Sequence, residues 1–141
     1  MNLELLVRLA GVGQIALVAA SPILIPRVLG WREELALLRP LTRQIFWTYA
    51  GYILCFNLAF GLVSAFTPDL LIDRSPLATA VSAFIAVYWI ARVLIQFFYY
   101  DRGAAPGGLV FVVGEWLLVA LFGYLSLVYL TVALVDARIV G

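Results

Sequence analysis

Four long apolar stretches, separated by short polar segments, constrain the fold of this chain more than any other feature. A transmembrane helix needs about 20 predominantly apolar residues, and the expected spans are residues 3–25, 45–66, 77–100 and 109–135. The chain is 65% hydrophobic and 12% charged, whereas soluble domains are about 45–50% apolar and about 25% charged. The sequence therefore predicts an all-α integral membrane protein, an up-down bundle of four transmembrane helices, with residues 1–141 as a single polytopic membrane domain.

The only substantial loop lies between the first two spans, and a short helix is expected within residues 31–39. Trp31, Leu35 and Leu38 follow i, i+4, i+7 spacing and so share one face. Such an amphipathic segment is typical of a helix that lies in the headgroup plane of the membrane. Pro40 is expected to end it.

The residue types that are missing exclude most cofactor chemistry. The chain has no His and no Lys, which removes the commonest ligand of transition metals and the residue that forms Schiff bases. Cys55 is the only cysteine, so no internal disulfide or thiolate cluster can form. We therefore expect no cofactor and no metal site. With a net charge of +1 and no basic stripe, nucleic acid is not an expected partner.

Two charged residues, Arg92 and Glu115, lie deep in the last two apolar stretches. Arg92 is nine residues before Asp101, and Glu115 is seven residues after Gly108. If the segment between them is a tight turn, a rise of about 1.5 Å per residue places both side chains roughly 10–14 Å inside the same membrane face. Charges at such depth usually pair or line a cavity. The sequence predicts an ion pair between Arg92 and Glu115 that closes the last hairpin.

Other polar side chains are expected to join this pair. Tyr88 and Gln96 lie four residues before and after Arg92 and so share its face, while Tyr49 and Tyr52 lie at a similar depth in the second span. One interpretation is a structural cluster in which the tyrosine hydroxyls satisfy the ion pair. The other is a pocket in which arginine binds an anionic headgroup, a carboxylate or a quinone oxygen, and the glutamate exchanges a proton.

Small and amide residues mark expected helix contacts. Gly11, Gly51 and Gly61 offer points where helices could approach closely, and Asn57 near mid-membrane is expected to hydrogen bond between helices. Gln14 is expected to form an interhelical hydrogen bond in the same way. The two prolines of the first span, residues 22 and 26, are expected to kink or end its helix.

Arginine counts predict the orientation in the membrane. With four spans, three arginines (Arg8, Arg74 and Arg138) fall on one side and five on the other: Arg27, Arg32, Arg39, Arg43 and Arg102. The positive-inside tendency places the five-arginine side in the cytoplasm and both termini outside. We expect a multi-pass protein of a bacterial inner (plasma) membrane.

Three classes of function remain open, in order of preference. The first is a non-catalytic accessory or structural subunit, whose partners are the lipid bilayer and other membrane-protein subunits or further copies of the chain. The second is a binder or transporter of a lipid-like or anionic small molecule at the Arg92 cluster. The third is an intramembrane enzyme with Glu115 as acid or base, and an enzyme is the less favoured interpretation.

Overall fold

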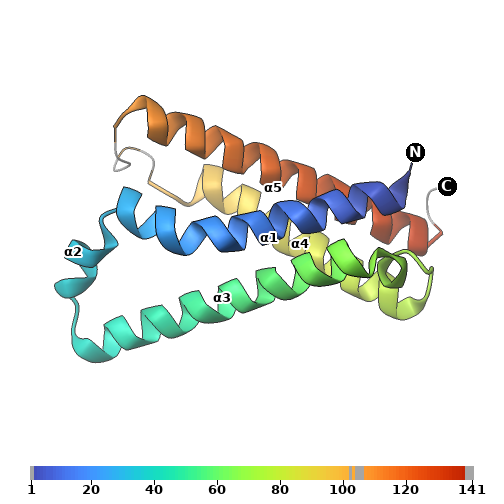
Figure 1. Cartoon of the computed structure of the whole chain (residues 1–141), viewed down its shortest axis with the longest axis horizontal. Helices are drawn as coiled ribbons and strands as arrows, with labels where there is room; N and C mark the ends of the chain where they lie inside the picture. Colours follow the sequence, from blue (N-terminus) through green and yellow to red (C-terminus); the bar gives the residue numbers. More distant parts are fainter. Residues whose placement is uncertain (1, 102, 104–106, 139–141) are drawn as a thin grey trace.

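The computed structural model describes residues 2–101, 103 and 107–138 and is helical almost throughout this part of the chain (Figure 1). Its elements are α1 (Leu3–Val28), α2 (Trp31–Ala36), α3 (Pro40–Phe66), the short 3-10 helix η1 (Pro68–Leu71), α4 (Pro76–Phe98) and α5 (Leu109–Asp136). Helices α1, α3, α4 and α5 are each long and apolar enough to cross a membrane. The predicted class, four transmembrane helices with a short helix between the first two, is confirmed.

Prolines start helices here more often than they end them. Pro40 is the first residue of α3, and Pro76 is the first residue of α4. A proline is well suited to this position because the amide proton that it lacks would have no partner in the first turn. The expectation that Pro40 ends the preceding helix is therefore wrong: α2 already stops at Ala36, and Pro40 opens the next element.

Helix α1 runs without a break through Pro22 and Pro26 and reaches Val28. Of the two expected effects of these prolines, a kink or an end, the end is wrong. Each proline removes one backbone donor, which would have bonded the carbonyl four residues earlier, and α1 continues because transmembrane helices tolerate such single losses. The helix stops where Gly30 takes the left-handed conformation, with φ of 64°, which glycine adopts without steric cost.

The loop before α4 is fixed by its own polar groups. The Ser75 hydroxyl caps α4 by accepting a hydrogen bond from the Ala78 amide at 3.0 Å. The Ser75 amide donates to the Asp73 carboxylate at 2.8 Å. Hydrogen bonds from Ser75 hold the pKa of the Asp73 carboxyl below its ordinary value of 3.8, because they favour the charged form.

The loop between α4 and α5 was predicted as a tight turn over residues 101–108. Arg102 and Ala104–Pro106 of that prediction lie outside the described residues. Gly108, the residue before α5, has a φ of 122°, which a residue with a side chain rarely adopts.

The helices pack as two pairs that meet at one end of the molecule. The most extensive contacts join α1 to α3 and α4 to α5, and α1 also contacts α5. The buried residues of α1 lie between Val7 and Gln14, and those of α3 between Asn57 and Ala65. Helices α1 and α3 therefore converge near the start of α1 and diverge toward α2 (Figure 1). We call the two ends of the bundle the packed end and the α2 end.

Glycine permits the close approach of α1 and α3 at the packed end. A Cβ atom on Gly11 would lie 2.4 Å from the Ala65 amide nitrogen and 2.7 Å from the Gly61 carbonyl oxygen. A Cβ atom on Gly61 would lie 2.9 Å from a side-chain carbon of Ile15. Both positions are too crowded for a larger residue. The two backbones are therefore in direct contact, as small residues allow between membrane helices.

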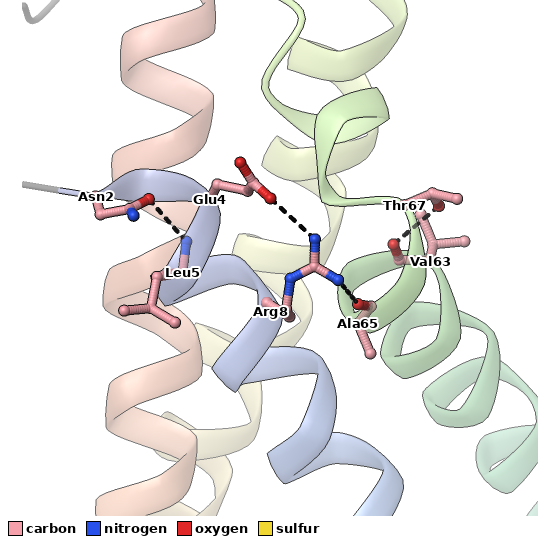
Figure 2. Close-up of polar contacts among 7 residues, drawn as sticks. All are labelled: Asn2, Glu4, Leu5, Arg8, Val63, Ala65 and Thr67. Carbon is pink, nitrogen blue, oxygen red and sulfur yellow. Dashed lines mark hydrogen bonds and ion pairs between the residues drawn. The ribbon is translucent and has the colours of Figure 1, made fainter.

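Arg8 completes this contact by capping the end of α3 (Figure 2). Its guanidinium donates to the Ala65 carbonyl at 2.8 Å and to the Glu4 carboxylate at 2.9 Å. The Ala65 carbonyl belongs to the last turn of α3, where backbone acceptors have no partner within the helix and the helix dipole is negative. Glu4 thus orients Arg8, and Arg8 connects the start of α1 to the end of α3.

Candidate functional site

A buried polar hub joins all four transmembrane helices at the packed end. It consists of Gln14 from α1, Ser64 from α3, Trp89 from α4 and Tyr129 from α5, and none of these residues is more than 2% exposed. The Gln14 side-chain amide donates to the Tyr129 hydroxyl and accepts a hydrogen bond from the Trp89 indole at 3.2 Å. The Tyr129 and Ser64 hydroxyls form a further hydrogen bond.

The hydrogen-bonding groups of this hub are engaged with one another. Besides Tyr129, the Gln14 amide also donates to the Ala10 carbonyl at 3.3 Å, so both its nitrogen and its oxygen have partners. The Gln14 side-chain amide can link several partners because it is a hydrogen-bond donor and an acceptor at once. The hub therefore fixes how the four helices sit relative to one another, and its groups do not point into an open cavity.

A second cluster contains the charged pair that the sequence singles out. In place of the predicted direct ion pair, Arg92 and Glu115 are joined through Gln96. The Arg92 guanidinium donates to the Gln96 amide oxygen at 3.2 Å, and the Gln96 amide nitrogen donates to the Glu115 carboxylate at 3.1 Å. Gln96 lies one turn after Arg92 on the same face of α4, so its side chain reaches between the two charges.

Aromatic rings cover the guanidinium of this cluster. The Arg92 guanidinium carbon lies 5.0 Å from the centroid of the Phe122 ring and 5.2 Å from that of Tyr100. Both distances suit cation–π interactions.

A direct ion pair is found elsewhere: in the part of the chain that the structure describes, it joins Arg8 and Glu4.

The predicted tyrosines do not gather around Arg92. Tyr88 turns toward α3, where its hydroxyl accepts a hydrogen bond from the Asn57 amide at 2.9 Å. Tyr49 and Tyr52 lie on α3 and are 65% and 61% exposed. Matching depth did not bring them together with Arg92, because α3 diverges from the other helices at this depth (Figure 1).

Asn57 links α3 to α4, and its amide nitrogen also donates to the Ile53 carbonyl at 2.8 Å. Its buried side-chain oxygen has no hydrogen-bond partner among the described residues.

The glycines that were predicted to lie at helix contacts differ from one another. Gly11 and Gly61 lie in the α1–α3 contact, whereas a Cβ atom on Gly51 would meet no atom within 4 Å.

Two features of the interior were missed from the sequence. The partners of Gln14 could not be identified, although the spacing of Phe122, Ser126 and Tyr129 marks one buried stripe of α5. Asp136, the last residue of α5, was not singled out. It is 3% exposed, and its carboxylate oxygens have no hydrogen-bond partner within the described ranges.

Composition, helix lengths and arrangement together define a small multi-pass α-helical membrane protein. Comparison of the chain with models of known protein families, with curated proteins and with solved structures finds no match. Any more specific function must therefore be argued from the geometry of this chain.

Proposed function

We propose that this protein is a non-catalytic accessory subunit of a membrane complex and that it binds a transmembrane helix of a partner protein on the outward face of α3. The observation that carries the proposal is the open space at Gly51. This glycine lies in a transmembrane helix, yet apart from the neighbouring backbone of its own helix nothing described comes within 4 Å of a Cβ built on it; the same holds for Gly114 and Gly123 of α5, but those two are half-buried, whereas Gly51 is exposed. Glycines in membrane helices are typical of sites where another helix approaches closely.

The position of Gly51 defines which side of α3 is the outward face. At about 100° per residue, Gly51 lies about 120° from Asn57 and about 140° from Ser64 around the helix, and both of these residues face the rest of the bundle. Four other small or polar residues share the outward direction, and all are exposed. The small and polar residues of this outward face of α3 are Gln44, Thr48, Gly51, Cys55 and Ala59, and the exposed side chains of Leu62 and Phe66 lie in the same direction toward the end of the helix.

The composition of this face suits a helix better than lipid. Lipid chains cover large apolar side chains without cost, so the exposed leucines elsewhere on the bundle need no protein partner. Small residues instead let two backbones come close and gain van der Waals contact, and an amide such as Gln44 can donate across the interface. The outward face of α3 therefore has the chemistry of a helix–helix interface without a second helix from this chain.

The interior supports a structural role over a catalytic one. The hub residues bond to one another, and the Arg92–Gln96–Glu115 cluster ties α4 to α5 through side chains that are already engaged. An acid–base enzyme at Glu115 would need its carboxylate available to a substrate, whereas the Gln96 amide donates to it here. In this proposal, attraction between Arg92 and Glu115 across Gln96 fixes the register of the last hairpin.

The test is whether the native complex depends on Gly51. Gly51→Leu fills the outward face, while Val87→Leu adds bulk at a 65% exposed position of α4 and serves as the matched control. We expect the natively extracted wild type and Val87→Leu to migrate as one complex of defined stoichiometry with a second membrane protein, and Gly51→Leu to migrate alone. A complex that withstands Gly51→Leu, or one built only from copies of this chain, would contradict the proposal.

A further inference from the structure

Two adjoining cavities lie at the α2 end, between the end of α1, α2 and the start of α3. The larger, of about 510 Å³, is lined by Pro22, Ile23, Pro26, Arg27, Arg32 and Glu33. The smaller, of about 340 Å³, is lined by Pro26, Trp31, Arg32, Leu35, Ala36, Arg43 and Trp47. They are open to the surface and share Pro26 and Arg32 in their walls, and we call the two together the α2 cavity. Its size falls within the usual range of about 300–1,000 Å³ for small-molecule sites.

The α2 cavity carries an excess of positive charge. Arg27, Arg32 and Arg43 line it, against the single carboxylate of Glu33. Within the ranges that the structure describes, none of the three guanidinium groups forms a hydrogen bond or an ion pair. Arg27 lines the larger cavity, Arg43 the smaller and Arg32 both, so three guanidinium groups from three helices offer unused donors to an anion. Arginine is the residue best suited to phosphate because its planar donors match phosphate oxygens.

The wall of the smaller part of the α2 cavity is mainly apolar and includes Trp31 and Trp47. Trp31 packs edge-on against Phe46 and Trp47, with ring centroids 5.0 and 6.1 Å apart. This aromatic group holds α2 against α3 and gives the cavity a rigid side. Tryptophan is enriched where the headgroups of a bilayer meet its apolar core.

The α2 cavity lies at the depth where the headgroups of a bilayer meet its apolar core. Arg27 is the second-last residue of α1, and Arg43 lies in the first turn of α3, so the charges lie at the ends of the transmembrane helices. Pro22 and Ile23 line the other side and lie four to five residues earlier along α1. At about 1.5 Å per residue, the cavity extends roughly 6–8 Å from the charged rim toward the apolar core.

We infer that the α2 cavity binds the headgroup of an anionic phospholipid. The phosphate would lie among Arg27, Arg32 and Arg43, and the first carbons of the acyl chains would follow Ile23 and Trp47 toward the bilayer core. Basic pockets between transmembrane helices bind such headgroups by the same chemistry. A free phosphate ion would use the arginines but leave the apolar wall without a ligand, so the structure favours the lipid.

This inference goes beyond the proposed function, because it concerns a different ligand, at the α2 end of α3. Arg43 and Trp47 line the cavity; at about 100° per residue Arg43 lies on the side of α3 that carries Asn57, whereas Trp47, one turn before Gly51, lies beside the outward face. The tests keep the two proposals apart, since Gly51→Leu leaves all three arginines in place.

The test is a titration of the detergent-purified protein with phosphatidylglycerol, phosphatidylcholine and inorganic phosphate, followed by native mass spectrometry. We expect phosphatidylglycerol to bind at least tenfold more tightly than either of the others. Each of Arg27→Gln, Arg32→Gln and Arg43→Gln should weaken binding roughly fivefold, and the triple variant about a hundredfold. Binding to the wild type should also weaken as salt is raised.

Arg39→Gln is the matched control. Arg39 is exposed on the same end of the bundle, directly before α3, but does not line the cavity. It should bind phosphatidylglycerol within about twofold of the wild type, since it removes the same charge outside the site. The four variants should keep the wild-type circular dichroism and unfolding midpoint without lipid, because the replaced guanidinium groups have no partner. Equal losses in Arg39→Gln and Arg32→Gln, equal binding of phosphatidylcholine, or equally tight binding of inorganic phosphate would each overturn the inference.

Discussion

The contact between α1 and α3 should be loosened by a single methyl group at Gly11. A Cβ atom there would lie 2.4 Å from the Ala65 nitrogen, 2.7 Å from the Gly61 oxygen and 2.8 Å from the Ser64 carbonyl carbon. All three are backbone atoms, so no side-chain rotation can relieve the clash. In Gly11→Ala, the helices must move apart.

The size of the effect follows from these distances. To reach an ordinary contact of 3.4 Å from 2.4 Å, the backbones must separate by 1.0 Å. A gap of about 0.5–1 Å already loses a quarter to a half of the energy of each van der Waals contact. Overpacking of this kind typically costs about 1–3 kcal/mol, and the 2.8 Å hydrogen bond from Arg8 to Ala65 would lengthen as well. We predict that Gly11→Ala lowers the free energy of unfolding by about 2–3 kcal/mol.

Gly51→Ala supplies the matched comparison in the same fold. Its Cβ atom would meet nothing within 4 Å, and alanine is the better helix former by about 1 kcal/mol in soluble hosts. The purified monomer should therefore unfold at the same or slightly higher denaturant. The assay is unfolding by increasing mole fraction of sodium dodecyl sulfate in mixed micelles, read by circular dichroism. Equal unfolding free energies for Gly11→Ala and Gly51→Ala would refute the close contact of α1 with α3.

Three further predictions concern the polar groups. Gln14→Leu removes the hydrogen bonds to Ala10, Tyr129 and Trp89 and leaves a buried indole N–H unsatisfied. Since that penalty is about 1–3 kcal/mol, the variant should lose about 2 kcal/mol in the same micelle assay, whereas Gln44→Leu at an exposed position should lose less than about 0.5 kcal/mol. Arg8→Met removes the cap on α3 and should raise amide hydrogen exchange in the last turn of α3, and unchanged exchange there would contradict the capping role. The Asp73 carboxyl should titrate below 3.8 by NMR, because Ser75 stabilises its charged form; Ser75→Ala should move its pKa back toward 3.8. Because the folded-state pKa is the lower one, this stabilisation is present above the unfolded-state pKa and is lost as the pH falls through the folded-state value.

The fold class could be predicted from the sequence because lipid imposes a simple constraint. A helix that crosses the bilayer must be long and apolar along its whole length, and the four stretches satisfy this without reference to one another. The residues at which the helices begin and end were predicted less well. Pro22 and Pro26 did not end α1, because a transmembrane helix tolerates the loss of single backbone hydrogen bonds. Pro40 started a helix, because the amide proton that it lacks has no partner in a first turn.

The candidate site was predicted only in part, because depth along a helix does not give rotation or spacing between helices. Arg92, Gln96 and Glu115 lie together, since two of them share a face of α4 and α5 is its nearest neighbour. Tyr49 and Tyr52 have the right depth but lie on a helix that diverges. The partners of Gln14 outside its own helix come from α4 and α5, and no local spacing within one helix indicates such a group.

Cys55 allows the most direct test of the central claim, that the outward face of α3 binds a transmembrane helix of another protein. It is exposed on that face, near the middle of α3, so p-benzoylphenylalanine introduced at this position by amber suppression would contact a partner helix in native membranes. The account predicts one discrete protein adduct after illumination, lost in Gly51→Leu and absent when the probe is placed at Val87 of α4, which is 65% exposed. Adducts with lipid alone, or an adduct of twice the mass of this chain, would contradict it.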